Sequence, residues 1–456
     1  QHDPQSPLYQ DVLCENDGKG NFTMRTAALP TITASGQNVK AADMDGDGDL
    51  DLFVGGRVAP KSYPLPGESL LLRNDSKPGE LKFTDVTDQW YKPLRSIGLV
   101  TDALWTDFDQ DGKVDLLIAG EWMPLTFLKN SGSGFTPFAP GDDVASAFGW
   151  WNSLAAADLD LDGDMDYIAG NFGSNQYFKC SSSEPLRIYG KDFDQNGAFD
   201  SFISCYFSDS TGRKQEYFFH SKDDMQKQLI LIRRKFEKYA DFGRATVKQV
   251  FTPEEMKGAT ILQANYMKSA WLENKGKEGF VLHALPVEAQ FAPIYGIQAM
   301  DLNGDAYPEI ILIGNDFGME TSQGRADALN GLVIENKGDG HFRSLGFEES
   351  GFFVPGDARA LAFVNLNGSL HLAATQNRKG LSFFSLPAAE KAITLDPAES
   401  QGEITLTNNR KQIVECGWGS SFLSQNSRSW IATKQLVSLK IKKDKAPKKP
   451  EQIGRA

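Results

Sequence analysis

The sequence has no long apolar run and only four cysteines. None of its 456 residues lies in a stretch approaching the roughly 18 consecutive apolar residues that a membrane-spanning helix needs. The cysteines lie far apart and form no C-x-x-C pair, which argues against a zinc site or a disulfide framework. The start, QHDPQSP, shows neither an initiator methionine nor a hydrophobic signal region, so any targeting signal has been removed or lies outside this sequence.

Signatures of several enzyme classes are also missing. The five histidines form no H-x-x-x-H pair, and the sequence contains neither a G-x-S-x-G nucleophile motif nor a P-loop. Its formal net charge of −13 argues against nucleic acid as a partner, because binding phosphates requires a basic face.

What the sequence does contain is an acidic motif that recurs five times. The first copy, residues 41–56, reads AADMDGDGDLDLFVGG, and the copies begin at residues 43, 107, 158, 192 and 301. Each is followed by a short apolar run, which predicts a buried strand. A sixth segment, VNLNGSLHLAATQN from residue 364, keeps the frame without carboxylates at the key positions, so we expect no metal there.

A second motif alternates with the first. ENDGKGNF at residue 15, KNSGSGF at 129, ENKGKEGF at 273 and ENKGDGHF at 335 each read as a hairpin turn, because Asn and Gly supply the positive φ of tight turns. One repeat is therefore strand, acidic loop, strand, strand, Asn-Gly turn, strand. Four antiparallel strands of this kind form one blade of a β-propeller.

The acidic loops have the spacing of a cation site. Carboxylates stand at positions one, three, five and nine of the first copy, where their oxygens would converge on a hard cation with about six to eight oxygen ligands, most naturally Ca²⁺. An EF-hand would place Glu at position twelve, which here is Val54, Ile118 or Ala169, so that interpretation fails. The alternative is an Asp-rich turn without metal.

Five Ca²⁺ ions would offset ten of the net negative charges and stabilise the fold directly. The predicted ligands are Asp43, Asp45, Asp47, Asp51, Asp107, Asp109, Asp111, Asp115, Asp158, Asp160, Asp162, Asp166, Asp192, Asp194, Asn196, Asp200, Asp301, Asn303, Asp305 and Glu309.

The loops and Asn-Gly turns resemble the FG-GAP/VCBS repeats of integrin-α-like β-propellers over roughly residues 10–385. VTDALWTDFDQDG, EPLRIYGKDFDQNG and SGFFVPGDARALAF are similar to the bacterial branch related to cartilage acidic protein, the ASPIC/UnbV group. RKQIVECGWGSSFLSQNSRSW is similar to that group's C-terminal signature. The resemblance implies an exported, cell-surface or outer-membrane-associated protein with a calcium-stabilised propeller, mostly without an assigned activity.

We therefore predict an all-β fold: a β-propeller over residues 1–389, with seven blades and with six or eight as alternatives. Two helices are expected in an insertion at about 220–270, the second starting at Thr252 as N-cap with Pro253 next. Residues 390–440 should form a small β appendage and 441–456 a basic, disordered tail. The segment 12–26 carries only the later half of a blade and is expected to pair with strands from the other end and close the ring.

The sequence leaves the function open between two classes. The first is a non-catalytic recognition module for a glycan or protein ligand at the cell surface. The second is a carbohydrate-active enzyme, such as a lyase using Arg325 and Asp327, and a structural scaffold is a further alternative. Polar loops after the apolar strands predict a ligand site at one propeller mouth, made of Trp150, Trp151, Asn171, Asn175, Asn315, Asp316, Arg325, Asp327, Asn330, Asn377 and Arg378.

Overall fold

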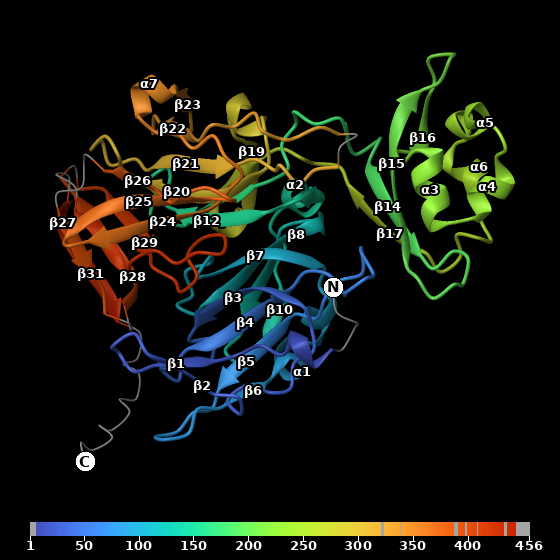
Figure 1. Cartoon of the computed structure of the whole chain (residues 1–456). Helices are drawn as coiled ribbons and strands as arrows, with labels where there is room; N and C mark the ends of the chain where they lie inside the picture. The colour runs from blue at the N-terminus through green and yellow to red at the C-terminus, as the bar shows by residue number, and fades with distance from the viewer. Residues whose placement is uncertain are drawn as a thin grey trace.

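The computed structural model describes residues 6–320, 323–338, 340–386, 391–396, 399–407, 409–432 and 436–443. Its fold is an all-β propeller built from small antiparallel sheets (Figure 1). We name the five ring sheets blades A to E. Blade A consists of β3 (Gly36–Ala42), β4 (Asp51–Gly56), β5 (Leu70–Asn74) and β6 (Phe83–Asp85), and blade B of β7 (Leu99–Thr106), β8 (Asp115–Met123), β9 (Thr126–Asn130) and β10 (Phe135–Pro137). Blade C consists of β12 (Ser153–Ala157), β13 (Asp166–Gly170), β18 (Ala270–Asn274) and β19 (Phe280–Ala284), blade D of β20 (Ile294–Met300), β21 (Glu309–Gly314), β22 (Leu332–Asn336) and β23 (Phe342–Leu345), and blade E of β24 (Ala358–Leu366), β25 (Ser369–Gln376) and β26 (Ser382–Ser385).

The first strands of the blades follow one another around the axis. β3 contacts β7, β7 contacts β12, β12 contacts β20 and β20 contacts β24. The predicted seven blades are not confirmed, because the described residues place five sheets in this succession. One acidic copy, residues 192–200, lies in an inserted sheet instead of a blade.

Short elements connect the strands. The two-residue strand β11 (Gly149–Trp150) pairs with the end of β8. The connecting helices are α1 (Thr87–Tyr91), α2 (Asp142–Ala145) and α7 (Phe347–Ser350), with 3-10 turns η1 (Pro7–Tyr9), η2 (Lys92–Ser96), η3 (Gly276–Glu278) and η4 (Val287–Gln290).

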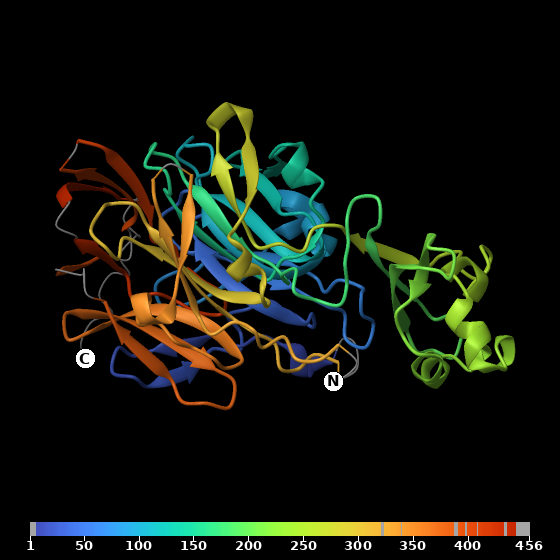
Figure 2. The same cartoon turned by 90° about the horizontal axis from the view of Figure 1, so that it is seen from above.

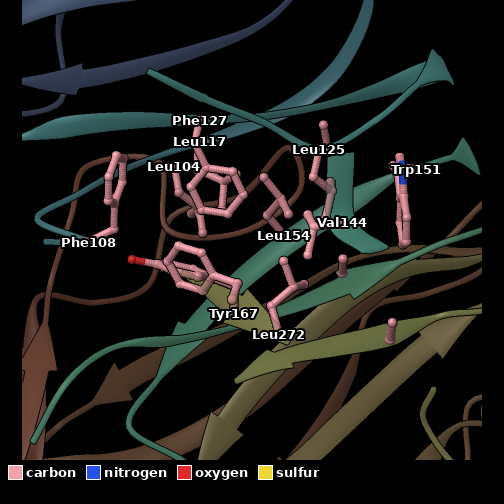
Figure 3. Close-up of a cluster of buried hydrophobic side chains, with 14 of the residues drawn as sticks. Leu104, Phe108, Leu117, Leu125, Phe127, Val144, Trp151, Leu154, Tyr167 and Leu272 are labelled. Carbon is pink, nitrogen blue, oxygen red and sulfur yellow. The ribbon is translucent and has the colours of Figure 1, made fainter. Parts of the chain in front are cut away.

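The core lies in layers between neighbouring blades. In the layer between blades B and C, Leu104 and Phe127 face Tyr167 and Leu272, and all four side chains are buried (Figure 3). The Tyr167 hydroxyl shares a 2.7 Å hydrogen bond with Thr106 Oγ1 of blade B, so the polar atom of this buried tyrosine side chain has a partner. Each such side chain contributes about 1.5–3 kcal/mol to folding, so facing apolar strands hold the blades together.

The insertion is larger than predicted and carries its own sheet. In the sequence the insertion lies between β13 and β18 of blade C. Its strands β14 (Leu186–Lys191), β15 (Asp200–Ser208), β16 (Lys214–Phe218) and β17 (Thr260–Ala264) form a separate sheet. Four short helices cover it: α3 (Lys222–Gln228), α4 (Leu231–Lys235), α5 (Tyr239–Arg244) and α6 (Val247–Val250). This unit stands to one side of the ring in both views (Figures 1 and 2).

The predicted second helix of the insertion is wrong. Thr252 does cap a turn, since its Oγ1 accepts the Glu255 N–H at 3.3 Å and Glu255 accepts the Thr252 N–H at 2.8 Å. The turn ends at Gly258, whose φ of 78° stops a right-handed helix. Beyond it, β17 alternates partly buried and exposed side chains and pairs with β14, so sheet pairing outweighs the local helix signal.

The C-terminal residues form two small sheets, drawn in red in Figure 1. β27 (Lys391–Thr394) pairs with β30 (Ser429–Ala432), and β28 (Glu399–Leu406) pairs with β29 (Lys411–Glu415) and β31 (Leu436–Lys443). The expected tail starts later than predicted, because β31 continues through Lys443. Residues 444–456 lie outside the described part of the chain.

The C-terminal segment 416–428 packs against the first strands near the axis. Lys40 of β3 donates its Nζ hydrogens to the carbonyls of Gly419 at 2.6 Å and Ser421 at 3.0 Å. The same ammonium forms a 2.8 Å ion pair with Asp102 Oδ1 of β7, and both side chains are almost fully buried. One cation therefore joins blade A, blade B and the C-terminal segment.

The N-terminal hairpin does not close the ring. β1 (Cys14–Asn16) and β2 (Phe22–Met24) pair with each other, and among the described residues no other strand joins their sheet. The expected pairing with strands from the other end of the chain is therefore not confirmed.

The buried ion pair gives the first prediction. Lys40→Ala leaves Asp102 buried without its cation, so unfolding should become easier by about 3–5 kcal/mol. The matched control is Lys227→Ala, whose ion pair with Asp224 is exposed and should contribute less than about 1 kcal/mol. Urea unfolding followed by tryptophan fluorescence measures both. Equal midpoints for the two variants would contradict the proposed role of the buried pair.

Candidate metal loops and the opposite polar face

The acidic loops bring three carboxylates of each copy together. At positions one, three and nine, oxygens lie within 4.8 Å of one another in four loops, in a group that could hold a metal ion. The groups are Asp43, Asp45 and Asp51; Asp107, Asp109 and Asp115; Asp158, Asp160 and Asp166; and Asp192, Asp194 and Asp200. Each loop is followed by a strand, as the sequence predicted, and not by the exiting helix of an EF-hand.

The carboxylate at position nine ties its loop to the Asn-Gly hairpin of the same blade. Asp51 Oδ1 accepts the Asn74 N–H at 2.8 Å and its Oδ2 accepts the Met44 N–H at 3.0 Å. Asp166 does the same with Asn274, at 2.9 Å, and Leu159, at 2.9 Å. The two sequence motifs are therefore parts of one structural unit.

The hairpin asparagines also join each blade to the one before it. Asn130 of blade B donates its Nδ2 to the Met44 carbonyl of loop A at 2.8 Å. Asn274 of blade C reaches the Phe108 carbonyl of loop B at 3.1 Å, and Asn336 of blade D reaches the Leu159 carbonyl of loop C at 2.7 Å. In each case position two of the preceding acidic loop supplies the carbonyl.

Burial makes these carboxylates costly to ionise. Desolvation raises the pKa of Asp51 to about 7, that of Asp115 to about 8 and that of Asp166 to about 9, and neighbouring carboxylates add to the effect. Asp115 Oδ2 and Asp158 Oδ1 are buried and accept no hydrogen bond among the described residues. A cation with oxygen ligands would satisfy both the charge and these oxygens, so the residues fit such an ion.

Position five lies outside the three-carboxylate groups. Asp111 Oδ1 accepts the Lys113 N–H at 3.0 Å, and Asp162 Oδ1 accepts the Asp164 N–H at 3.1 Å, so both carboxylates cap a turn of their own loop. In loop B the Lys129 ammonium contacts Asp109 and lies 3.2 Å from Asp111 Oδ2. Lys129 therefore already neutralises part of that loop's charge.

The fifth loop is arranged differently. Asn303, at position three, donates its Nδ2 to Glu309 Oε1 at 2.9 Å and to Asp305 Oδ2 at 3.0 Å. Burial raises the pKa of Glu309 to about 7. An amide nitrogen thus faces the carboxylates where the other loops place a carboxylate oxygen.

The C-terminal sheet covers the loop face of blades B and C. Asp158 Oδ2 accepts the Ile413 N–H of β29 at 3.0 Å, and Glu415 Oε1 accepts the Asp107 N–H at 3.1 Å. A cleft of about 730 Å³ remains beside loop A, lined by Asp45, Asp107, Glu415, Trp105 and Trp418 among others.

At the opposite face, β-bulges interrupt the first strands of four blades at corresponding places. The register shifts lie between Gly36 and Asn38, Val100 and Asp102, Ile294 and Gly296, and Ala358 and Leu361. Bulges re-aim side chains and occur often beside binding sites. The residues at two of these bulges are Tyr295 and Arg359, and the Arg359 guanidinium lies 4.1 Å from the centre of the Tyr295 ring.

Ionic and aromatic groups gather around these bulges. Arg57, after β4, pairs with Glu121, and Glu121 Oε2 accepts the Tyr63 hydroxyl at 3.2 Å. The Trp122 indole N–H donates to the Tyr63 oxygen at 2.6 Å. Burial and the Glu121 charge raise the pKa of Tyr63 well above its usual range.

The second half of this group belongs to blades D and E. The Tyr295 hydroxyl donates to Asp316 Oδ2 at 3.2 Å, and Arg359 Nη1 lies 2.7 Å from Asp357 Oδ1. Burial raises the pKa of Tyr295, and Asp316 and Glu121 raise it further. We name the set Arg57, Tyr63, Glu121, Trp122, Tyr295, Asp316, Asp357 and Arg359 the mouth cluster.

Three of the predicted mouth residues have structural roles instead. Trp151 is fully buried in the layer between blades B and C. Asn171 is fully buried and bonds to main-chain groups of residues 150, 172, 266 and 268. Asn315 is fully buried and bonds to main-chain groups of Leu329 and Gly356. Buried amides with all their hydrogen bonds made inside the protein leave nothing for a ligand.

The other predicted mouth residues keep varied exposure. Trp150 packs against Trp122 and Phe172, and its indole N–H is buried with no partner among the described residues. Asp316 belongs to the mouth cluster. Six residues lie exposed on loops: Asn175, Arg325, Asp327, Asn330, Asn377 and Arg378. Arg325 lies over the Phe317 ring at 5.4 Å, and no ion pair joins it to Asp327 among the described residues.

Sequence reasoning missed most of the mouth cluster. Arg57 and Glu121 each follow the glycine that ends an apolar run, in VGGR and IAGE, the same place as the residues that were selected in blades C and D. That position was a usable signal. Tyr295 and Arg359 precede their repeats in IYGIQ and DARAL, where only the bulge directs them toward the mouth.

Two segments of the chain match the model of the FG-GAP-like repeat, residues 7–54 and 107–169. This supports the FG-GAP repeat assignment for the N-terminal hairpin with β3, the first acidic loop and the start of β4, and for the acidic loops of blades B and C. A search of curated proteins finds no match. No helix among the described residues is long and apolar enough to cross a membrane.

Several solved structures are distantly similar. A rhamnogalacturonan lyase PL11 of Bacillus licheniformis is 12% identical, with a TM-score of 0.30, over 84% of this chain and 64% of that one. The exotype rhamnogalacturonan lyase YesX is 12% identical, with a TM-score of 0.31, over 80% and 59%. The rhamnogalacturonan lyase YesW is 10% identical, with a TM-score of 0.30, over 93% and 76%. The chain thus spans less than two thirds of the first two, and their activity is not transferred to it.

Asp115 allows a clean test of the metal loops. In Asp115→Asn the Oδ1 still accepts the Asn130 N–H, at 2.7 Å in the parent, while the amide nitrogen replaces the unpartnered Oδ2. With chelator at pH 9 the variant should be more stable than the parent, because it removes a buried charge. Titration with Ca²⁺ should show affinity at that loop roughly tenfold lower or worse. Asp241→Asn, at an exposed helix position, is the control that should change neither. Lower stability of Asp115→Asn in chelator would contradict the account.

The raised pKa values also predict how the metal-free protein responds to pH. The position-nine carboxyls bind protons more tightly folded than unfolded, so their stabilising effect is complete below about pH 4 and is lost as pH rises through 6 to 9. The thermal midpoint measured in chelator should therefore fall between pH 5 and pH 9. Excess Ca²⁺ should flatten this dependence, since the ion holds the carboxylates ionised. A chelated midpoint that rises with pH would refute the prediction.

Proposed function

We propose that this chain is an exported or cell-surface β-propeller, stabilised by about five Ca²⁺ ions, that acts as a non-catalytic recognition module for a glycan or protein. The acidic loops would hold the ions at one face. The ligand would bind at the opposite face, over the mouth cluster.

The observation that carries the proposal is the convergence of groups from four blades on one face. Arg57 and Glu121 come from blades A and B, whereas Tyr295 and Arg359 come from blades D and E. Aromatic rings beside guanidinium groups suit both sugar rings and protein side chains, since they offer apolar faces with directed hydrogen-bond donors. The bulges that aim Tyr295 and Arg359 give this face a shape that blade packing alone does not require.

The same geometry favours recognition over a lyase reaction. A lyase acting on an acidic sugar would need a cation to neutralise the substrate carboxylate and a group able to take up a proton. Here Arg57 is paired with Glu121 and Arg359 with Asp357. The Tyr63 pKa is raised, so its hydroxyl stays protonated at neutral pH and is a poor base.

The test is binding to an array of immobilised glycans and to candidate cell-surface proteins, with and without chelator. Binding should require Ca²⁺, and Arg57→Ala combined with Arg359→Ala should weaken it at least roughly tenfold, as loss of charge-assisted hydrogen bonds does. Arg343→Ala, half-exposed on the outer hairpin of blade D, is the control that should bind normally.

Two outcomes would contradict the proposal. New unsaturated ends in a polysaccharide after incubation would indicate a lyase. Normal binding by the double arginine variant, with an unchanged thermal midpoint, would remove the ligand site from the mouth cluster.

A further inference from the structure

The N-terminal hairpin β1–β2 has the sequence and shape of the outer half of a blade. Its turn, Asn16-Asp17-Gly18, has the Asn-x-Gly pattern of the hairpins in blades B to D, and Asn16 Oδ1 accepts the Gly18 N–H at 3.0 Å as Asn130 Oδ1 accepts that of Gly132 at 2.7 Å. In the four-stranded blades this hairpin always pairs with an inner half made of strand, acidic loop and strand. No inner half accompanies β1–β2 among the described residues.

The exposure of the hairpin confirms that its partner surface is uncovered. All six residues of the two strands are exposed. Phe22 is 67% exposed, whereas the corresponding Phe135 and Phe280 of blades B and C are 4% and 3% exposed. A phenylalanine that is buried in blades B and C, and partly buried as Phe83 and Phe342 in blades A and D, is therefore mostly exposed here.

The hydrogen bonds of the hairpin asparagine are missing in the same way. In blades A, B and C the main-chain N–H of this asparagine donates to the position-nine carboxylate of the inner half. No carboxylate accepts the Asn16 N–H among the described residues. The hairpin thus lacks the acceptor that the hairpins of blades A, B and C have.

A groove runs beside β3 where the inner strand of such a blade would lie. It has a volume of about 440 Å³ and is lined by residues 37–41 of β3 and by residues of the C-terminal segment between Trp418 and Gln425. Val39, facing away from blade B, is 54% exposed.

The other side of the gap is equally uncovered. Blade E has three strands among the described residues, and its last strand β26 is paired on one side only. Phe383 on β26 is 49% exposed and the neighbouring Leu381 is 53% exposed. Blade E therefore leaves apolar side chains half exposed, as blade A does at Val39. The C-terminal segment contacts β3 at Lys40 and β24 at Phe363, and it leaves the groove beside β3 as an open space.

We propose that this space binds a polypeptide segment that forms two strands joined by an acidic loop, and that this segment completes a blade with β1–β2. The second strand of the segment pairs with the free edge of β1, because strand edges with unpaired N–H and C=O groups are templates for such addition. The position-nine carboxylate of the segment accepts the Asn16 N–H. The first strand lies in the groove beside β3, where it covers Val39.

The probe is a synthetic peptide with the sequence of residues 99–121, the inner half of blade B, labelled with a fluorophore and added to the full chain in Ca²⁺. Fluorescence anisotropy should show saturable one-to-one binding. Hydrogen exchange at residues 14–16 should slow at least tenfold when the peptide is bound, because exposed strand amides become paired.

Variants on both sides sharpen the test. The peptide with Asp115→Ala should bind at least tenfold more weakly, since it lacks the acceptor for Asn16. In the protein, Phe22→Asp should weaken binding similarly without lowering the thermal midpoint, because Phe22 is already in solvent. Phe347→Asp, at a 61% exposed position on α7, should bind like the parent.

Three results would overturn the proposal. The first is no saturable binding by a folded protein. The second is binding that leaves exchange at residues 14–16 unchanged, which would place the peptide elsewhere. The third is a stable dimer of the full chain by light scattering that excludes the peptide, which would make a second copy the occupant.

Discussion

The ring depends on a buried carboxylate at position nine of each acidic loop. Asp51 and Asp166 each accept two main-chain hydrogens, one from their own loop and one from the hairpin of the same blade. The same hairpin asparagines reach the preceding loop, so loop, hairpin and blade seam form one hydrogen-bonded system. Its stability is limited by electrostatics, because several carboxylates crowd within 4.8 Å of one another. A cation bound among these oxygens would relieve that crowding.

The two faces of the propeller therefore do different things. At the loop face, four copies of the motif place aspartates at positions one, three and nine, and their oxygens lie close together. At the opposite face the equivalent positions differ from blade to blade: Arg57, Glu121, Asn171 and Asn315 each follow the glycine that ends the apolar run of the second strand. Two of these are buried amides with structural roles, and two form a partly buried ion pair. Variation among otherwise equivalent positions is what a specific binding face needs.

Local sequence predicted well wherever a structure depends on near neighbours. The acidic loops, the Asn-Gly hairpins and the apolar strands after them follow from spacing within about ten residues, and all are present. Prediction failed where pairing partners are distant. The segment from Thr252 carries a helix N-cap, yet β17 forms because β14, seventy residues earlier, offers it an edge. Trp151 looked available for a ligand, but the layer between blades B and C buries it completely.

The sequence by itself determined the repeat unit, the candidate metal ligands and the absence of the common catalytic motifs, because these depend on residue type and short spacing. Only the tertiary structure decided how the repeats are used. It placed the loop of residues 192–200 in an inserted sheet, gathered Arg57, Tyr295 and Arg359 on one face, and left β1–β2 without an inner half. The physical reason is that these outcomes are set by which strand edges and faces meet, and such contacts join residues far apart in the chain.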